Sequence, residues 1–433
     1  MFFSNKKIKR AFISFVAAVS LISCSAVFTT PVHADNTSSY QADQLNLNVK
    51  SAIAIDSNSG QILYAKNAAK TLPIASMTKL VTVYLTLQAI KDKKLSWDQK
   101  VKPTAPIVKV ANNAEYSNVP LKMGHSYTIR QLYQATLIES ANGAAMLLGQ
   151  TIAGSQKAFI NQMRQQVKKW GIEDAKIYTA CGLPNGNLGK DAYPGVNKNA
   201  ENTMSAKDMA IVGQNLIKDF PEVLDTTKLA HLDFKDGNKT TKMANFNWML
   251  KGLSQYDKAY PVDGLKTGTT DAAGACFIGT VEHSGARLIT VVMGARHQDG
   301  TDPSRFIQTK KLMNFIFNKY RPVTMTAGSQ MNGAKSIKVT DGDNATTNLG
   351  LKDRTTIWDP ADGKTLVASL DKKTIEAPIT KDQTIGNYQF KSGSEKIVSL
   401  SNPNGMNVKA KALSANGKVN FFVRIWRWIF GGR

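Results

Sequence analysis

The sequence predicts an α+β protein in which helices cover an antiparallel sheet, followed by a small all-β domain and an amphipathic C-terminal helix. Strand-like segments lie on both sides of a long helical region, an order that is typical of α+β domains. After residue 321 the chain changes to short β-rich segments, and residues 418–433 combine aromatic residues with arginines. We therefore expect a leader at 1–34, a first domain at 35–321, a β-rich domain at 322–412 and a tail helix at 413–433.

The leader has the composition of a secretory signal peptide. Four basic residues between positions 6 and 10 precede an apolar segment at 11–28, and Val32-His33-Ala34 is a small-residue cleavage pattern. A rival interpretation takes Leu21 to Cys24 as a lipoprotein cleavage box with Cys24 lipidated, but the apolar segment continues past that cysteine. The mature chain would keep Cys181 and Cys276, by default two buried free thiols.

The net charge is +23, from 55 Lys and Arg against 32 Asp and Glu. Loss of the four basic leader residues would leave +19, so the secreted chain stays strongly basic. An excess of this size favours an anionic partner. Because a secreted protein meets no genome, we exclude nucleic acid and retain a membrane surface or an anionic wall polymer.

The elements of the first domain follow from periodicity and from turn-forming residues. A hairpin is expected from two strands around Ser57-Asn58-Ser59-Gly60. The expected strands are 51–56, 61–66, 262–268, 274–280 and 287–293. The expected helices are 73–90, 128–149, 156–170, a short one from the N-cap Ser205, and 304–320. Polar residues at 139–143 interrupt the apolar pattern of the second helix.

Ser76 and Lys79 form the first candidate catalytic pair. They are three residues apart at the start of an apolar helix, so their side chains share one face. A hydroxyl beside an amine is a nucleophile beside its base, provided that burial and the helix dipole keep the amine neutral. The same S-x-x-K pattern occurs at Ser4 and Ser369, so this motif alone is weak evidence.

Two further motifs follow in order. Ser140-x-Asn142 interrupts a helix, and Lys266-Thr267-Gly268 lies on a predicted strand. There Lys266 would supply a fixed positive charge, and Gly268 would let a substrate backbone approach closely. The ordered set S-x-x-K, S-x-N and K-T-G is the signature of serine penicillin-recognising enzymes.

With these motifs the chain resembles the low-molecular-weight penicillin-binding proteins, specifically the serine-type D-alanyl-D-alanine carboxypeptidases. The resemblance covers nearly the whole mature chain, including Asn245-x-Asn247 and the segment 203–210. It implies the penicillin-recognising fold shared by β-lactamases and DD-peptidases. It also implies an enzyme that removes the terminal D-alanine from peptidoglycan stem pentapeptides and that β-lactam antibiotics acylate.

The resemblance also implies a role for each motif residue. Ser76 would form the acyl-enzyme, Lys79 would accept its proton, and Ser140 would relay a proton to the leaving D-alanine. The implied substrate contacts are Asn142 with the amide, and Lys266 and Thr267 with the carboxylate. The backbone N–H groups of Ser76 and Thr269 would form an oxyanion hole. Arg296, after the last strand, is a further candidate for the carboxylate, and a solvated arginine is equally compatible with its position.

No metal or other cofactor is expected. The chain has five histidines without metal-ligand spacing, and we interpret His125, His231, His283 and His297 as ordinary loop residues.

Three alternatives remain open. A β-lactamase of the related class A type would need a loop glutamate for deacylation, yet neither Glu173 nor Glu201 lies in an E-x-x-x-N pattern. An endopeptidase that cuts D-alanyl cross-links has the same motifs. A membrane-tethered wall-binding protein with a relict site is the non-enzymatic alternative.

The tail places the protein at a membrane surface. Residues 418–433 are too short to span a bilayer, which needs about 20 apolar residues. Dense aromatics with Arg424 and Arg427 among them are typical of a helix that lies in the headgroup region. We therefore expect an extracytoplasmic protein, attached peripherally to the outer face of the cell membrane.

Overall fold

The structure, a computed structural model, describes residues 40–430 without the side chains of residues 427 and 428. The expected signal peptide at 1–34 and the alternative lipidation of Cys24 fall outside the described residues.

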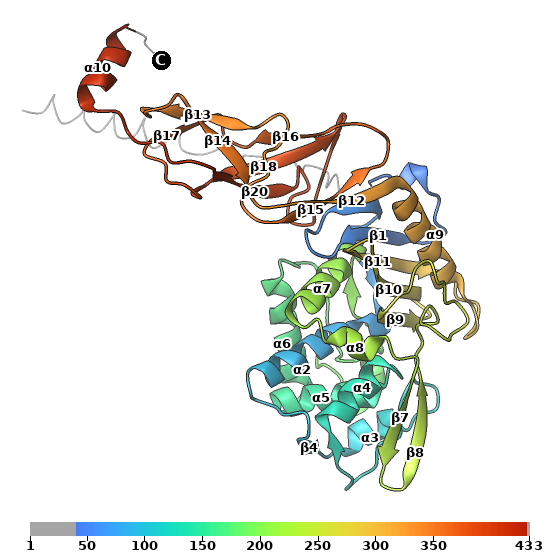
Figure 1. Ribbon diagram of the computed structural model, residues 1–433. Helices are drawn as coiled ribbons and strands as arrows, with labels where there is room; N and C mark the ends of the chain where they lie inside the picture. The colour runs from blue at the N-terminus through green and yellow to red at the C-terminus, as the bar shows by residue number, and fades with distance from the viewer. Residues whose placement is uncertain (1–39, 431–433) are drawn as a thin grey trace, which may run out of the picture. The chain divides into compact units, whose positions relative to one another are not determined.

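A five-stranded antiparallel sheet in the order β2-β1-β11-β10-β9 is the centre of the first part of the chain (Figure 1). Its strands are β1 (Ser51–Asp56), β2 (Ile62–Lys66), β9 (Gly264–Thr270), β10 (Gly274–His283) and β11 (Ala286–Ala295). The first hairpin joins strands more than 200 residues later in the chain through the β1–β11 pairing. The predicted hairpin and strands are confirmed, and β9, which carries the K-T-G motif, lies at one edge of the sheet.

Helices cover both faces of this sheet because its strands are apolar on both faces. Ile53 and Ile55 of β1 belong to an apolar cluster that includes the helix α7, whereas Ala52 and Ala54 point to the opposite cluster with α9. The helices are α2 (Lys79–Lys91), α3 (Ala105–Ala111), α4 (Ile129–Leu137), α5 (Asn142–Ala153), α6 (Gln156–Lys169), α7 (Ala206–Asp219), α8 (Val223–Thr227) and α9 (Ser304–Lys319).

Two helix predictions need correction. Pro73 does not begin a helix: it lies in the short strand β3, and a 3₁₀ turn precedes α2. The single helix predicted over 128–149 is two helices, α4 and α5, because Ser140 between them has a left-handed backbone with φ 56°. The remaining short elements are η1 (Ala42–Gln44), β3 (Leu72–Pro73), η2 (Ala75–Thr78), β4 (Lys100–Val101), β5 (Tyr127–Thr128), η3 (Asn185–Asp191), β6 (Thr203–Met204), β7 (His231–Asp236) and β8 (Lys239–Ala244).

The chain after α9 is built from strands, as the predicted fold class requires. β12 (Tyr320–Met325) spans the expected boundary and pairs with β15 (Thr355–Pro360). The other strands form one sheet with its own apolar cluster around Leu349, Tyr388 and Phe390. They are β13 (Ser336–Thr340), β14 (Thr346–Leu351), β16 (Leu366–Leu370), β17 (Thr374–Glu376), β18 (Thr384–Ser392), β19 (Glu395–Lys396) and β20 (Asn407–Ala412).

Trp358 of β15 connects this β-rich part to the first hairpin. Its indole is fully buried, and its Nε1 donates to Asp56 Oδ1 at 2.9 Å. The side chain of Gln61 bonds both backbone groups of Trp358, at 2.7 and 2.9 Å. A buried indole N–H needs such an acceptor, so these bonds fix the position of Trp358 against the first hairpin.

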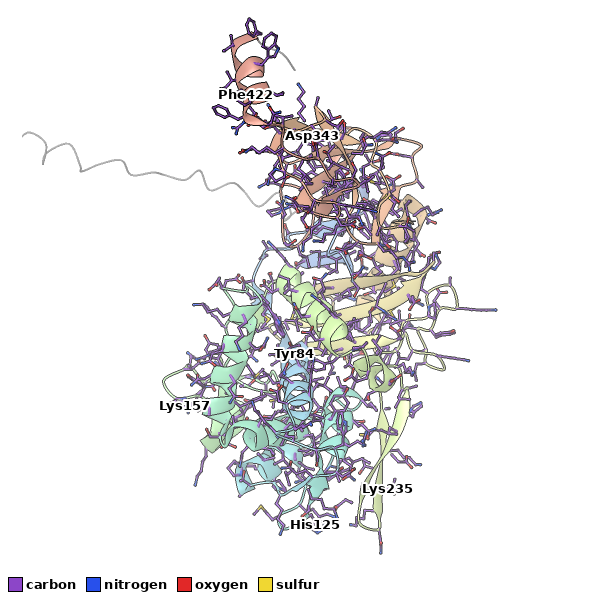
Figure 2. The ribbon with its side chains drawn as sticks, turned by 60° about the vertical axis from the view of Figure 1, so that its left-hand side comes forward. Tyr84, His125, Lys157, Lys235, Asp343 and Phe422 are labelled. Atoms are coloured by element: carbon purple, nitrogen blue, oxygen red, sulfur yellow. The ribbon has the colours of Figure 1, made fainter. Side chains whose placement is uncertain are left out.

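The tail forms α10 (Phe421–Phe430), whose apolar side chains are exposed rather than docked on the protein. Phe422 is 80% exposed and extends away from the strands (Figure 2). Arg424 pairs with Asp341 at 2.7 Å near the start of the helix. Within residues 40–430, none of the helices combines the length and the apolar run that crossing a bilayer demands.

Candidate active site

Ser76 lies in the 3₁₀ turn η2, directly before α2. Buried Ile74 and Met77 anchor this turn, and the backbone N–H of Ile74 donates to Asn202 O at 3.0 Å. Ala75 has a left-handed backbone with φ 47°, a strained conformation for a residue with a Cβ. The turn therefore presents Ser76 to a pocket of about 360 Å³ that it helps to line.

Lys79 lies in contact with Ser76, as the spacing predicts. Its Nζ is 2.7 Å from Ser76 Oγ, 2.8 Å from Asn142 Oδ1 and 2.7 Å from the carbonyl oxygen of Cys181. The side chain is completely buried. Burial lowers the pKa of Lys79 from 10.5 to about 8, although the nearby Cys181 acts in the opposite direction.

The three contacts of Lys79 suit a base. A neutral amine has two N–H groups and one lone pair. The two carbonyl-type oxygens, Asn142 Oδ1 and Cys181 O, accept hydrogen bonds but donate none, so they orient the two N–H groups. The lone pair then faces the third neighbour, Ser76 Oγ, and can accept its proton.

The S-x-N motif lies at the break between α4 and α5. Ser140 is 4% exposed and lines the pocket. Asn142, the first residue of α5, does not line it: its Oδ1 accepts from Lys79 and its Nδ2 donates to Ser117 O at 3.1 Å. Both polar atoms of the Asn142 side chain therefore bond to groups of the protein. The structure supports a role for Asn142 in positioning Lys79.

Lys266 of β9 is buried beside the pocket, with 2% of its surface exposed. Its Nζ donates to Thr267 O at 3.3 Å. Burial, together with the charges of Lys79 and Arg305, lowers the pKa of Lys266 well below its usual value. Glu139 acts in the opposite direction and favours the charged lysine. Its carboxylate accepts the Ala244 N–H at 2.9 Å.

Gly268 permits a close approach, but within the protein itself. A Cβ at this position would lie 2.7 Å from Ile74 O and 3.2 Å from Ser76 N, contacts that real Cβ atoms avoid. Gly182 also permits a close approach, since a Cβ at this position would lie 2.0 Å from Ala75 O. Two glycines thus let β9 and the loop before η3 press on the turn that carries Ser76.

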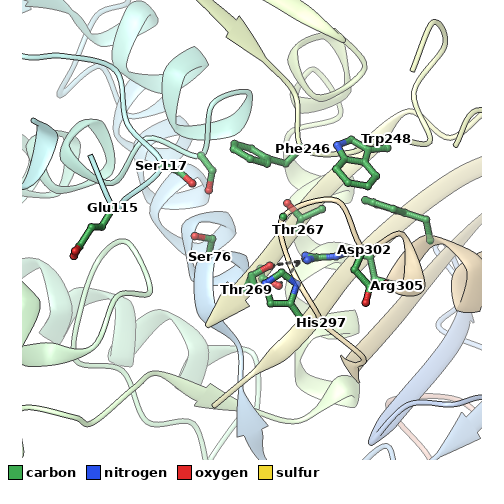
Figure 3. Close-up of a pocket in the computed structure, with 14 residues that line it drawn as sticks. Ser76, Glu115, Ser117, Phe246, Trp248, Thr267, Thr269, His297, Asp302 and Arg305 are labelled. Atoms are coloured by element: carbon green, nitrogen blue, oxygen red, sulfur yellow. Dashed lines mark hydrogen bonds between the residues drawn. The ribbon is translucent and has the colours of Figure 1, made fainter. Parts of the chain in front are cut away.

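Arg296 is not brought to the pocket. It pairs with Asp302 at 3.2 Å, its side chain is 66% exposed, and it is not among the pocket-lining residues. Arg305, in the first turn of α9, lines the pocket instead. Its guanidinium donates to Gly268 O at 3.0 Å and to Thr269 Oγ1 at 2.7 Å (Figure 3).

Sequence reasoning missed Arg305, although a signal was present. Arg305 shares the helical spacing of Thr309, Leu312 and Ile316, all on the buried face of α9. A charged residue on an apolar helix face must find polar partners, which makes it a candidate for a site. Arg296, at the end of a strand, carries no such constraint.

The pocket wall combines polar and aromatic residues (Figure 3). Thr267, Gly268 and Thr269 of β9 line it, as the motif predicts. Phe246 and Trp248 form one side and extend the contact to Phe306, whose ring centroid is 5.4 Å from that of Trp248. Glu115 and Ser117 also line the pocket, and Figure 3 shows Glu115 on the other side of Ser76 from Trp248.

The structure also places the histidines and cysteines that the sequence analysis considered. His231 and His283 lie in strands rather than loops, and His297 lines the pocket. Within residues 40–430, no cluster of acidic, His and Cys side chains could hold a metal ion. Cys181 and Cys276 are both buried and free, which confirms the default expectation.

Comparison with known proteins decides the family. The family described as D-alanyl-D-alanine carboxypeptidase matches residues 36–297. The chain belongs to this carboxypeptidase family. Among curated members, it is 30% identical over 392 residues to the D-alanyl-D-alanine carboxypeptidase DacC of Escherichia coli, covering 89% of this chain and 88% of the relative. It is 27% identical to DacF of Bacillus subtilis, over 82% of this chain and 85% of the relative.

Solved structures of two other proteins share the fold. A peptidoglycan synthesis regulatory factor from Streptococcus pneumoniae has 33% identity and a TM-score of 0.71, over 86% of this chain and 100% of its own. Penicillin-binding protein 5 of Haemophilus influenzae has 25% identity and a TM-score of 0.68, over 86% of this chain and 99% of its own. Both alignments extend well beyond residue 297, so the shared fold includes strands after α9.

Replacing Gly268 by alanine tests the packing of β9 on the serine turn. We expect Gly268→Ala to slow covalent labelling by a fluorescent penicillin about tenfold or more, because a small displacement of reacting groups is costly. Gly300→Ala is the matched control, since Gly300 lines the same pocket and a Cβ there meets nothing within 4 Å. Equal labelling rates for the two variants would contradict the proposed packing constraint.

Proposed function

We propose that Ser76 is the nucleophile with which this serine-type D-alanyl-D-alanine carboxypeptidase removes the terminal D-alanine of peptidoglycan stem pentapeptides. The contact of 2.7 Å between Lys79 Nζ and Ser76 Oγ is the observation that carries the proposal. It joins a nucleophile to a buried base whose pKa lies near neutrality.

The reaction proceeds in two steps. Lys79 accepts the Ser76 proton while Oγ attacks the carbonyl carbon of the penultimate D-alanine. The peptide bond breaks, the leaving D-alanine takes up a proton by way of Ser140, and the stem remains esterified to Ser76. Water then hydrolyses the ester. Backbone N–H groups of Ser76 and Thr269 stabilise the oxyanion of each tetrahedral intermediate.

The terminal carboxylate is the feature that a carboxypeptidase must recognise. Thr267 and Thr269 offer hydroxyls on the pocket wall, and Arg305, which also lines the pocket, supplies positive charge. The pKa of buried Lys266 is lowered well below its usual value, and a substrate carboxylate would favour its protonated form. Arg305 takes the place first given to Arg296. Asn142 fixes the direction of Lys79, and its contact with the substrate amide stays a prediction.

β-Lactams are proposed to acylate Ser76 in the same way. The structure of a penicillin-binding protein from Listeria monocytogenes in its ampicillin-bound form is 33% identical to this chain, over 62% of it, with a TM-score of 0.50. Slow hydrolysis of the acyl-enzyme ester formed with a β-lactam would distinguish this enzyme from a β-lactamase. Among the candidate loop glutamates, Glu173 pairs with Lys168 and Glu201 accepts from Thr270 Oγ1, so neither lines the pocket.

The protein is extracytoplasmic, as its role in peptidoglycan metabolism requires, and we propose peripheral attachment through α10. The exposed apolar side chains of this helix, together with the net charge, support binding to an anionic membrane surface. The proposed division of the mature chain remains 35–321, 322–412 and 413–433, with the strands between α9 and α10 as a spacer.

Product analysis with a matched serine control tests the function. We expect the enzyme to release one alanine from a stem pentapeptide, seen by mass spectrometry, and Ser76→Ala to release none and to form no penicillin adduct. Ser369→Ala is the control, because Ser369 belongs to the other S-x-x-K match of the mature chain, in β16. Release from a cross-linked dimer but not from the pentapeptide would identify an endopeptidase, the activity named for a relative 24% identical to this chain.

The pH dependence of acylation tests the state of Lys79. Because its pKa is lowered to about 8, the neutral amine and the labelling rate should rise with pH through that value. An unshifted lysine would give a midpoint above about 10, which would contradict the assignment. Cys181→Ala keeps the backbone carbonyl that orients Lys79 but removes the thiol that raises the Lys79 pKa, so the midpoint should fall somewhat below 8 and not rise.

Truncation tests the membrane anchor. Deleting residues 418–433 should release active enzyme from membranes, and loss of activity along with the tail would contradict the anchor. Phe422→Ser with Trp426→Ser should weaken binding of the full chain to anionic vesicles by about tenfold or more, because each buried aromatic side chain contributes roughly 1.5–3 kcal/mol. Met123→Ser, at an exposed apolar residue far along the chain from α10, is the control.

A further inference from the structure

A second cavity, of about 720 Å³, lies beside the active-site pocket, between α3 and η3. The segment 113–117 forms a shared wall. Asn113 and Tyr116 line the second cavity, whereas Glu115 and Ser117 line the pocket of Ser76. Neighbouring side chains of one short segment thus face two cavities, so a ligand that extends out of the active site past this segment enters the second one.

Tyr116 lies close to the catalytic machinery. Burial, with smaller effects from Glu115 and Cys181, raises the pKa of its phenol. The carbonyl oxygen of Cys181 is one of the three contacts of Lys79 Nζ. The second cavity therefore begins near the catalytic lysine and is not a remote surface feature.

The lining of this cavity has a mixed chemistry. Val110 and Leu188 are buried and give an apolar floor. Asn113 and Asn187 add side-chain amides, and Tyr116 adds an aromatic ring. Such a lining suits a ligand with hydroxyl and amide groups as well as apolar faces.

Two lysines make the cavity positively charged. Lys109 of α3 and Lys190 of η3 are exposed members of its lining. In the described part of the chain neither pairs with an acidic side chain, although many other lysines do. Two unneutralised ammonium groups favour an anionic ligand.

We propose that this cavity binds the amino end of the stem peptide, with its acidic residue, together with the amino sugar that carries it. The proposal rests on the proposed function, because only a stem cleaved at Ser76 would extend from one cavity into the other. The pocket of Ser76, of about 360 Å³, is at the small end of the range for ligand pockets. We assign it the two D-alanines and assign the rest of the stem to the second cavity. The lysines meet the carboxylate of the acidic residue, and the amides meet the sugar.

Paired substrates test this assignment. One is an N-acylated tripeptide ending in two D-alanines, and the other is a muramyl pentapeptide with a free carboxylate on its second residue. We expect Lys109→Gln with Lys190→Gln to lower kcat/KM for the muramyl pentapeptide about fivefold through KM, since exposed ion pairs contribute up to about 1 kcal/mol each. Hydrolysis of the tripeptide should stay unchanged.

The matched control removes the same charge elsewhere. Lys157→Gln with Lys218→Gln alters two exposed lysines on α6 and α7, away from both cavities (Figure 2 shows Lys157), and should leave both substrates unaffected. Ala105→Trp, at an exposed position of the cavity wall, fills space without changing charge and should also impair only the long substrate.

The outcomes separate this inference from the proposed function. Equal effects of the cavity variants on both substrates, or no difference from the control lysine pair, would overturn the second site while leaving the carboxypeptidase intact. If the unaltered enzyme neither forms a penicillin adduct nor cleaves either substrate, the proposed function fails and the second site fails with it.

Discussion

A buried lysine amine in contact with a serine hydroxyl is the interaction on which the rest of the site depends. Lys79 has no solvent contact, so three protein oxygens must satisfy its nitrogen. Those oxygens come from η2, from the start of α5 and from the loop before η3. Three distant segments therefore have to meet at one atom, and burial of that atom is also what lowers its pKa toward neutrality.

Meeting at one atom requires backbone to approach backbone. Gly268 and Gly182 both lie against the serine turn, at positions where a Cβ would come within 3 Å of a carbonyl oxygen. Ala75 of the same turn adopts a left-handed backbone. The strain of this turn is retained because the surrounding strands and helices are packed on both faces of the sheet. The same packing explains why a Cβ at Gly268 would collide with the protein's own turn, although Gly268 also lines the pocket.

The sequence predicted the fold class, the central strands and the pairing of Ser76 with Lys79, because these depend on periodicity and on short-range spacing. It failed where a tertiary contact overrides a local pattern. The helix over 128–149 breaks at Ser140, whose left-handed backbone no propensity reveals. Arg296 follows the last strand of the sheet, yet its side chain is largely exposed, pairs with Asp302 and does not line the pocket. Arg305 comes from α9, which packs on β10 and β11, and its guanidinium reaches Gly268 O of the neighbouring strand β9. The local sequence of neither α9 nor β9 predicts that tertiary contact.

The charges of the site also explain why the terminal carboxylate matters to the chemistry. Lys266 is buried with a weak carbonyl contact and with Lys79 and Arg305 nearby, so its pKa lies well below its usual value. Glu139 offsets this only in part. A substrate carboxylate placed against β9 would supply the missing counter-charge and favour protonated Lys266. A charged Lys266 in turn disfavours a second ammonium at Lys79, because like charges in a buried site oppose each other. Recognition of the carboxylate therefore favours a proton on Lys266, beside the bound negative charge, and a ligand without that carboxylate would leave Lys266 without its counter-charge.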